Sequence, residues 1–181
     1  MLNLTFAKLK KIGQKIIKII KIKKSFRPPK KAKILVFDKV GLNNLKPLFD
    51  GEPFEVFHVR GENLNFSPII LYRCLLHKIR ERSLFNCYFQ AYIDQVSPAI
   101  VITYIDNNSA FQQVDLKNRN NERKFIAIAN GTRKFSGPQE ILKMNGPLPE
   151  DIYHSNLFCQ GQYCADQYLN NGATVKNLFP V

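Results

Sequence analysis

From residue 33 onward the sequence alternates between short apolar runs and longer amphipathic stretches, and this alternation constrains the fold more than any other feature. The runs at 33–38 (KILVFD) and 99–105 (AIVITYI) are apolar almost throughout, which is typical of strands buried on both faces. Further strands are predicted at 54–59, 124–129, 157–159 and 175–179, and helices at 42–49, 69–80, 85–96, 109–115 and 162–170. Strands that alternate with helices indicate a parallel sheet with helices on both faces. We therefore expect one α/β, Rossmann-like domain over residues 32–181.

The segment 1–31 differs from the rest of the chain in charge. It contains eleven Lys and Arg residues and no Asp or Glu, although the whole chain has a net charge of +13. The remaining sixteen basic residues nearly balance the fourteen acidic ones, which leaves residues 32–181 with a net charge of only +2. Any interaction that depends on strong positive charge is therefore expected to use residues 1–31.

This N-terminal segment has the spacing of a basic amphipathic helix followed by a linker. Apolar residues recur at steps of three and four, and lysines occupy the opposite side. Such a helix suits the surface of an anionic membrane, where the apolar side enters the acyl chains and the lysines meet the headgroups. The predicted membrane-binding residues are Lys8, Lys11, Lys15, Lys18, Ile12, Ile16 and Ile20.

Two other partners remain open for this segment. The apolar stripe is also compatible with docking on a protein partner or on the domain itself. A nucleic-acid-binding arm is the less suitable interpretation, because such arms seldom have an isoleucine stripe and no aromatic stacking platform accompanies this one. Lysine interrupts every apolar stretch, so neither a secretory signal nor a membrane-spanning helix is predicted. We expect a cytoplasmic protein that is peripheral at the inner membrane face.

The four cysteines do not have the spacing of a metal site. Only Cys159 and Cys164 lie close together, at a Cys-x4-Cys spacing, with His154 as the one histidine near them. We expect buried or half-buried thiols in a reducing compartment and no metal.

The ends of the predicted strands contain the polar residues that are the strongest candidates for catalysis or ligand binding. Ligands of parallel α/β sheets bind outside the carboxyl ends of the strands. Asp106 follows the strand at 99–105 directly, which makes it our candidate for a general base. Asp-Asn-Asn and Asn-Gly are also common in turns and helix caps, and that alternative stays open. The predicted substrate-binding residues are Gly41, Asn107, Asn108, Asn130, Gly131, Thr132 and Arg133.

Two of these strand-and-loop runs resemble a known family. Residues 101–108 (VITYIDNN), followed by 125–133 (FIAIANGTR), are similar to the amino-terminal half of bacterial surface-carbohydrate biosynthesis glycosyltransferases of the two-domain GT-B type. The resemblance covers about residues 33–181. It implies a cytoplasmic transferase that adds a sugar to a growing surface polysaccharide, with the acceptor bound by this half.

The same resemblance implies that the nucleotide-sugar donor binds a second Rossmann-like domain, which residues 33–181 do not contain. We therefore expect no cofactor in this chain, a carbohydrate acceptor as ligand, and a complementary C-terminal transferase half as partner, in a truncated or split enzyme. P-loop and dinucleotide-binding glycine motifs are absent from the sequence. The alternative is a non-catalytic Rossmann-like binding or assembly module recruited to a membrane surface.

Overall fold

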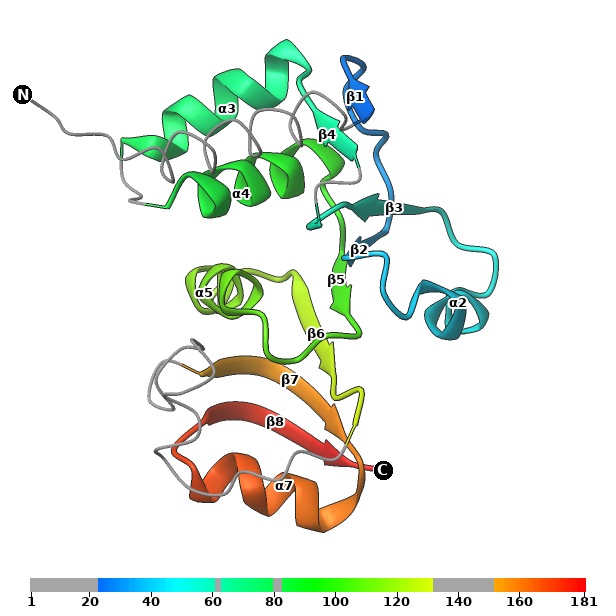
Figure 1. Ribbon diagram of the computed structural model, residues 1–181, viewed down its shortest axis with the longest axis vertical. Coiled ribbons are helices and arrows are strands. Elements are labelled where there is room, and N and C mark those ends of the chain that lie inside the picture. Colours follow the sequence, from blue (N-terminus) through cyan, green and yellow to red (C-terminus); the bar gives the residue numbers. More distant parts are fainter. Residues whose placement is uncertain (1–22, 61–62, 80–82, 132–151) are drawn as a thin grey trace, which may run out of the picture.

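The computed structural model describes residues 23–60, 63–79, 83–131 and 152–181, and it contains strands and helices in alternation (Figure 1). The predicted stripe of residues 1–22 lies outside the described residues, as do Thr132 and Arg133. The elements, in chain order, are β1 (Lys23–Ser25), β2 (Ile34–Phe37), α2 (Leu42–Leu45), the 3-10 helix η1 (Lys46–Phe49), β3 (Phe54–Phe57), β4 (Asn63–Asn65), α3 (Pro68–Lys78), α4 (Leu84–Val96), β5 (Ile100–Thr103), α5 (Ser109–Asn118), β6 (Lys124–Ile128), β7 (Tyr153–Cys159), α7 (Gly161–Asn170) and β8 (Thr174–Pro180).

Six strands form one parallel sheet in the order β3-β2-β5-β6-β7-β8. The first strand of this sheet, β2, lies inside it and pairs with β3 on one side and β5 on the other. The chain therefore builds the sheet outward in one direction to β3, then returns and continues through β5 to β8. The predicted α/β, Rossmann-like fold with a parallel sheet is confirmed.

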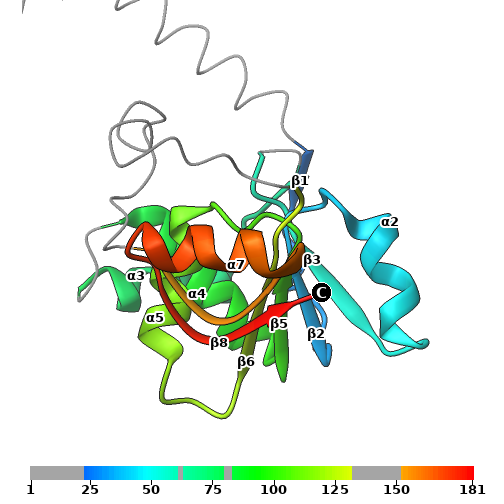
Figure 2. The ribbon, with the colours of Figure 1, turned by 90° about the horizontal axis from the view of Figure 1, so that it is seen from below.

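Helices cover both faces of the sheet, but unequally. On one face, α4, α5 and α7 share the main core with the strands, and Phe37 of β2 lies at its centre with ring centroids 4.6 Å from Phe89 and 5.4 Å from Phe111. On the other face, α2 and η1 place Leu45 and Phe49 against β2 and β5 (Figure 2). Burying a side chain of this size stabilises the fold by about 1.5–3 kcal/mol.

The small parallel sheet of β1 and β4 was not predicted. The backbone N–H of Phe66 donates to the carbonyl of Ser25 at 2.7 Å, and Asn65 Nδ2 donates to the carbonyl of Arg27 at 2.8 Å. Residues 23–27, which we assigned to the N-terminal helix and linker, are thus hydrogen-bonded to the region around β4.

Helix α3 packs against α4 and forms an outer layer at one end of the molecule (Figure 1). Ser67 caps α3 by accepting from Ile70 N–H, and Ser83 caps α4 by accepting from Asn86 N–H, so both helices begin where a serine satisfies free backbone donors. Of the residues of α3, Ile70 and Cys74 are buried. All four cysteines are buried free thiols, as expected. Among the described residues, no helix is long and apolar enough to cross a membrane.

Candidate functional site

The carboxyl ends of β2 and β5 lie side by side at the point where the strand order reverses, which is the usual ligand position in open parallel sheets. The loop after β2 runs through Asp38 to Gly41, and the loop after β5 runs from Tyr104 to Asn108. The two loops touch, because a Cβ added at Gly41 would overlap the ring of Tyr104. Gly41 also has a φ of +76°, which favours glycine. The structure therefore brings two of the predicted strand ends together.

The loop after β3 contributes an ion pair at the same edge. Arg60 Nε donates to Asp38 Oδ2 at 3.0 Å, and the other carboxylate oxygen of Asp38 accepts from Val40 N–H at 3.2 Å. Asp38 is buried and has a positive φ of 75°, whereas Arg60 is exposed. Lys39 is exposed beside them. This edge thus offers a guanidinium and an ammonium to solvent, next to the half-buried ring of Tyr104.

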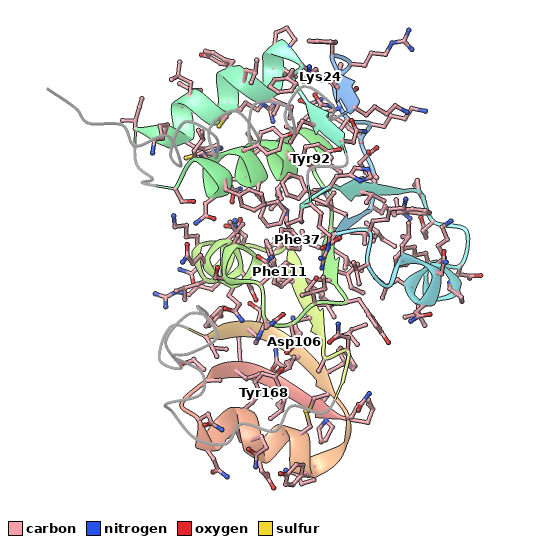
Figure 3. All side chains as sticks on the ribbon, viewed as in Figure 1. Lys24, Phe37, Tyr92, Asp106, Phe111 and Tyr168 are labelled. Atoms are coloured by element: carbon pink, nitrogen blue, oxygen red, sulfur yellow. The ribbon has the colours of Figure 1, made fainter. Side chains whose placement is uncertain are left out.

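Asp106, the predicted general base, is only 1% exposed. Its Oδ2 accepts a hydrogen bond from the hydroxyl of Tyr168 on α7, and its backbone carbonyl accepts from Gln112 Nε2 at 2.9 Å (Figure 3). Gln112 Nε2 in turn lies 3.5 Å from Nε2 of the buried His154 on β7. A general base must reach the proton that it removes, and this carboxylate instead links the end of β5 to α7.

The two asparagines after Asp106 have different surroundings. The side chain of Asn108 caps α5, since its Oδ1 accepts from the N–H groups of Ala110 at 3.0 Å and Phe111 at 3.2 Å. The helix-cap alternative is therefore confirmed for Asn108. Asn107 is exposed at the same edge and remains a candidate for ligand binding.

The loop after β6 adds Asn130 and Gly131 next to the loop after β5, because β5 and β6 are neighbours in the sheet. Asn130 is exposed, and the space around the Cα of Gly131 is open. The candidate site thus consists of Lys39, Gly41, Arg60, Tyr104, Asn107, Asn130 and Gly131. The predicted substrate-binding residues did not include Lys39, Arg60 or Tyr104, although Tyr104 lies within the predicted strand that ends at the site.

A second polar region, a cavity of about 380 Å³, lies beside β3 and the small sheet. Tyr92 and Tyr88 of α4 line it together with His58 and Glu55, and the Tyr92 hydroxyl donates to Glu55 Oε1 at 3.2 Å. Burial, reinforced by Glu55, raises the pKa of Tyr92 well above its usual range. This tyrosine therefore stays protonated at neutral pH and acts as a hydrogen-bond donor.

A third buried acid lies away from the strand ends. Asp115 of α5 accepts from the backbone N–H of Ser155 at 2.8 Å and from the Ser155 hydroxyl at 2.5 Å. Burial raises the pKa of Asp115 to about 6, although both hydrogen bonds act in the opposite direction. It connects α5 to β7. Within the described ranges, no group of three or more His, Cys, Asp or Glu side chains could hold a metal ion.

Comparison with family models, with curated proteins and with solved structures yields no match for this chain.

Proposed function

We propose that residues 32–181 bind a carbohydrate acceptor at the strand-end site and form the acceptor-side domain of a GT-B glycosyltransferase of bacterial surface polysaccharide biosynthesis. The observation that carries this proposal is the meeting of the loops after β2 and β5 at the reversal of the strand order. Amide groups at Asn107 and Asn130 both donate and accept hydrogen bonds, which suits the hydroxyl groups of a sugar. The ring of Tyr104, next to Gly41, supplies apolar surface at the same edge.

The buried position of Asp106 favours a version of this proposal in which acceptor binding and catalysis belong to different domains. With Asp106 engaged by Tyr168, the domain binds and positions the acceptor, while the nucleotide-sugar donor and the chemistry belong to a complementary half. The same burial supports the alternative function, a non-catalytic Rossmann-like module that recruits a partner. The two differ in ligand: the transferase domain binds carbohydrate, and the assembly module binds a protein.

The proposed location is the cytoplasmic face of the membrane, where residues 1–22 bind anionic lipid. An acceptor carried on a lipid lies at that surface, so tethering raises its effective concentration near the site.

An array of bacterial surface glycans, probed with the full chain, tests the proposal. The best-binding glycan is then titrated into ¹⁵N-labelled protein, and we expect the largest shifts at Lys39, Tyr104, Asn107 and Asn130. Asn107→Ala and Asn130→Ala should each weaken binding about fivefold or more, since each removes about 1 kcal/mol of hydrogen bonding. Asn120→Ala is the matched control, because Asn120 is also an exposed asparagine but precedes β6, at the opposite edge of the sheet.

Binding that is confined to the cavity beside β3, or equal losses in all three variants, would refute the strand-end site. Absence of any glycan binding, together with capture of a protein partner through the same residues, would favour the assembly module.

A further inference from the structure

The outer side of α3 is apolar and exposed over the whole length of the helix. Leu75 is 67% exposed and Ile79, the residue that ends the helix, is 80% exposed. At about 100° per residue, the exposed apolar residues fall within one sector of about 160°, opposite the buried Ile70 and Cys74. We call this surface the α3 face; it consists of Ile69, Leu71, Tyr72, Leu75, Leu76 and Ile79.

Such a face needs a partner. Soluble monomers rarely expose a contiguous apolar patch of this kind unless it is an interaction site. The inner side of α3 already satisfies the fold, because it packs on α4 and buries Ile70 and Cys74 there. The outer leucines and isoleucines therefore contribute little to the stability of the domain.

The charges around the α3 face are positive. On the helical projection, Arg73 borders one side of the apolar sector and Lys78 the other, and α3 itself has no Asp or Glu. Lys23 and Lys24 of β1 are exposed, and β1 lies beside β4 at the same end of the molecule as α3 (Figures 1 and 3). Residues 80–82, outside the described residues, are two arginines and one glutamate in the sequence.

One acid of α4, Asp94, contacts α3 through His77, which does not belong to the α3 face. Its Oδ2 lies 2.8 Å from His77 Nε2, and its Oδ1 accepts from Gln90 Nε2 at 2.9 Å, both on the side where α3 meets α4. A partner that carries negative charge therefore suits the basic residues around the α3 face.

The basic surroundings discriminate among the possible partners that could cover the α3 face. Residues 1–22 contain lysines and no acid, so covering the α3 face with this segment would place like charges next to Arg73 and Lys78. A second copy of α3 would repeat the same conflict. An anionic lipid surface suits both the apolar side chains and the flanking cations of the α3 face, because its acyl chains accept the former and its headgroups neutralise the latter.

We propose that the α3 face inserts into the interface of an anionic membrane, with Arg73, Lys78, Lys23 and Lys24 at the headgroups. This contact is separate from the one assigned to residues 1–22 and fixes the orientation of the folded domain on the membrane. It does not depend on the glycan or on the transfer reaction.

Sedimentation with vesicles tests the proposal, using the full chain and vesicles of phosphatidylglycerol and phosphatidylcholine. Leu75→Gln/Leu76→Gln removes apolar area without adding charge and keeps good helix formers on α3. Leu48→Gln/Leu169→Gln is the matched control: Leu48 and Leu169 are 67% and 51% exposed, against 67% and 47% for Leu75 and Leu76, but lie on η1 and α7. We expect the α3 variant to bind at least about tenfold more weakly and the control to bind like the parent chain. Equal binding by both variants would overturn the proposal.

Fluorescence identifies what covers the face. The chain has no tryptophan, so the indole introduced by Leu75→Trp is a single reporter, with Leu48→Trp as its control. We expect a blue shift of Leu75→Trp on adding phosphatidylglycerol vesicles, and quenching by brominated acyl chains, with neither effect for Leu48→Trp. A blue-shifted spectrum without vesicles, or a dimer that Leu75→Gln/Leu76→Gln dissociates, would assign the face to the protein itself and overturn the lipid contact.

The result of the vesicle-binding test is independent of the result of the glycan-binding test. Leu75→Gln/Leu76→Gln leaves the strand-end site intact and should retain glycan binding, whereas Asn107→Ala and Asn130→Ala should retain vesicle binding.

Discussion

Replacing Gly41 by alanine should destabilise the fold for two separable reasons. The first is the backbone: a non-glycine residue at a φ of +76° costs about 1 kcal/mol. The second is the overlap of the new Cβ with the ring of Tyr104, which must move and should cost a further 1–3 kcal/mol, roughly. We therefore expect the free energy of unfolding of Gly41→Ala to fall by about 2–4 kcal/mol in total.

The chain supplies a control for the first cost. Gly51 has nearly the same φ, +75°, but a Cβ added there would meet nothing within 4 Å. Gly51→Ala should therefore lose only the backbone share, about 1 kcal/mol. Urea unfolding followed by circular dichroism measures both variants, and Gly41→Ala/Tyr104→Ala completes a double-mutant cycle with an expected coupling of about 1–3 kcal/mol. If Gly41→Ala is no worse than Gly51→Ala, or if the cycle is additive, the two loops do not meet as described.

Three further substitutions test the buried polar contacts. Tyr168→Phe should lower the free energy of unfolding by about 2 kcal/mol in urea titrations, because it leaves the buried carboxylate of Asp106 without its hydroxyl donor; an unchanged midpoint would contradict that contact. The raised pKa of Asp115 contributes stability that is complete below about pH 4 and is lost as the pH rises through about 6. Relative to Asp115→Asn, the free energy of unfolding of the parent should therefore fall by up to about 3 kcal/mol between pH 4 and pH 7. A flat difference across these pH values would exclude the raised pKa. Asn108→Ala should cost about 1 kcal/mol by thermal unfolding through loss of the α5 cap, whereas Asn107→Ala should cost less than 0.5 kcal/mol, roughly.

The sequence predicts the sheet well because its central strands have an unambiguous pattern. The apolar runs at 33–38 and 99–105 became β2 and β5, which lie side by side in the middle of the sheet. The predicted helices at 69–80 and 85–96 became α3 and α4, with Ser67 and Ser83 as caps. The pairing of β1 with β4 was missed because a three-residue strand such as Lys-Lys-Ser has no apolar period to detect.

The candidate site could be predicted only in part. The positions of the strand ends follow from the sheet, and they placed Gly41, Asn107 and Asn130 at one edge. Exposure does not follow from strand position, since it depends on which distant helix covers a loop. Tyr168 lies 62 residues from Asp106 and no short-range pattern links the two. For the same reason Arg60, which pairs with Asp38 across 22 residues, gave no signal.

The contrast between Asp106 and Asn107 shows why the polar strand ends of such a domain divide into two groups. The parallel sheet brings every strand end to one edge, but the polar residues there differ in burial: Asp106 is buried and hydrogen-bonded to Tyr168 of α7, whereas Asn107 is exposed. The buried acids at the strand ends, Asp38 and Asp106, must be paired within the protein, since an unpaired buried acid costs several kcal/mol, on the order of 3–5. The exposed polar side chains of the same loops, Lys39, Arg60, Asn107 and Asn130, face solvent and are available to a ligand. Any binding activity of the described residues at this edge should therefore be concentrated at the β3, β2, β5 and β6 ends, and substitutions at Asp106 should affect it by displacing α7 and the loop after β5 rather than by removing a contact to the ligand.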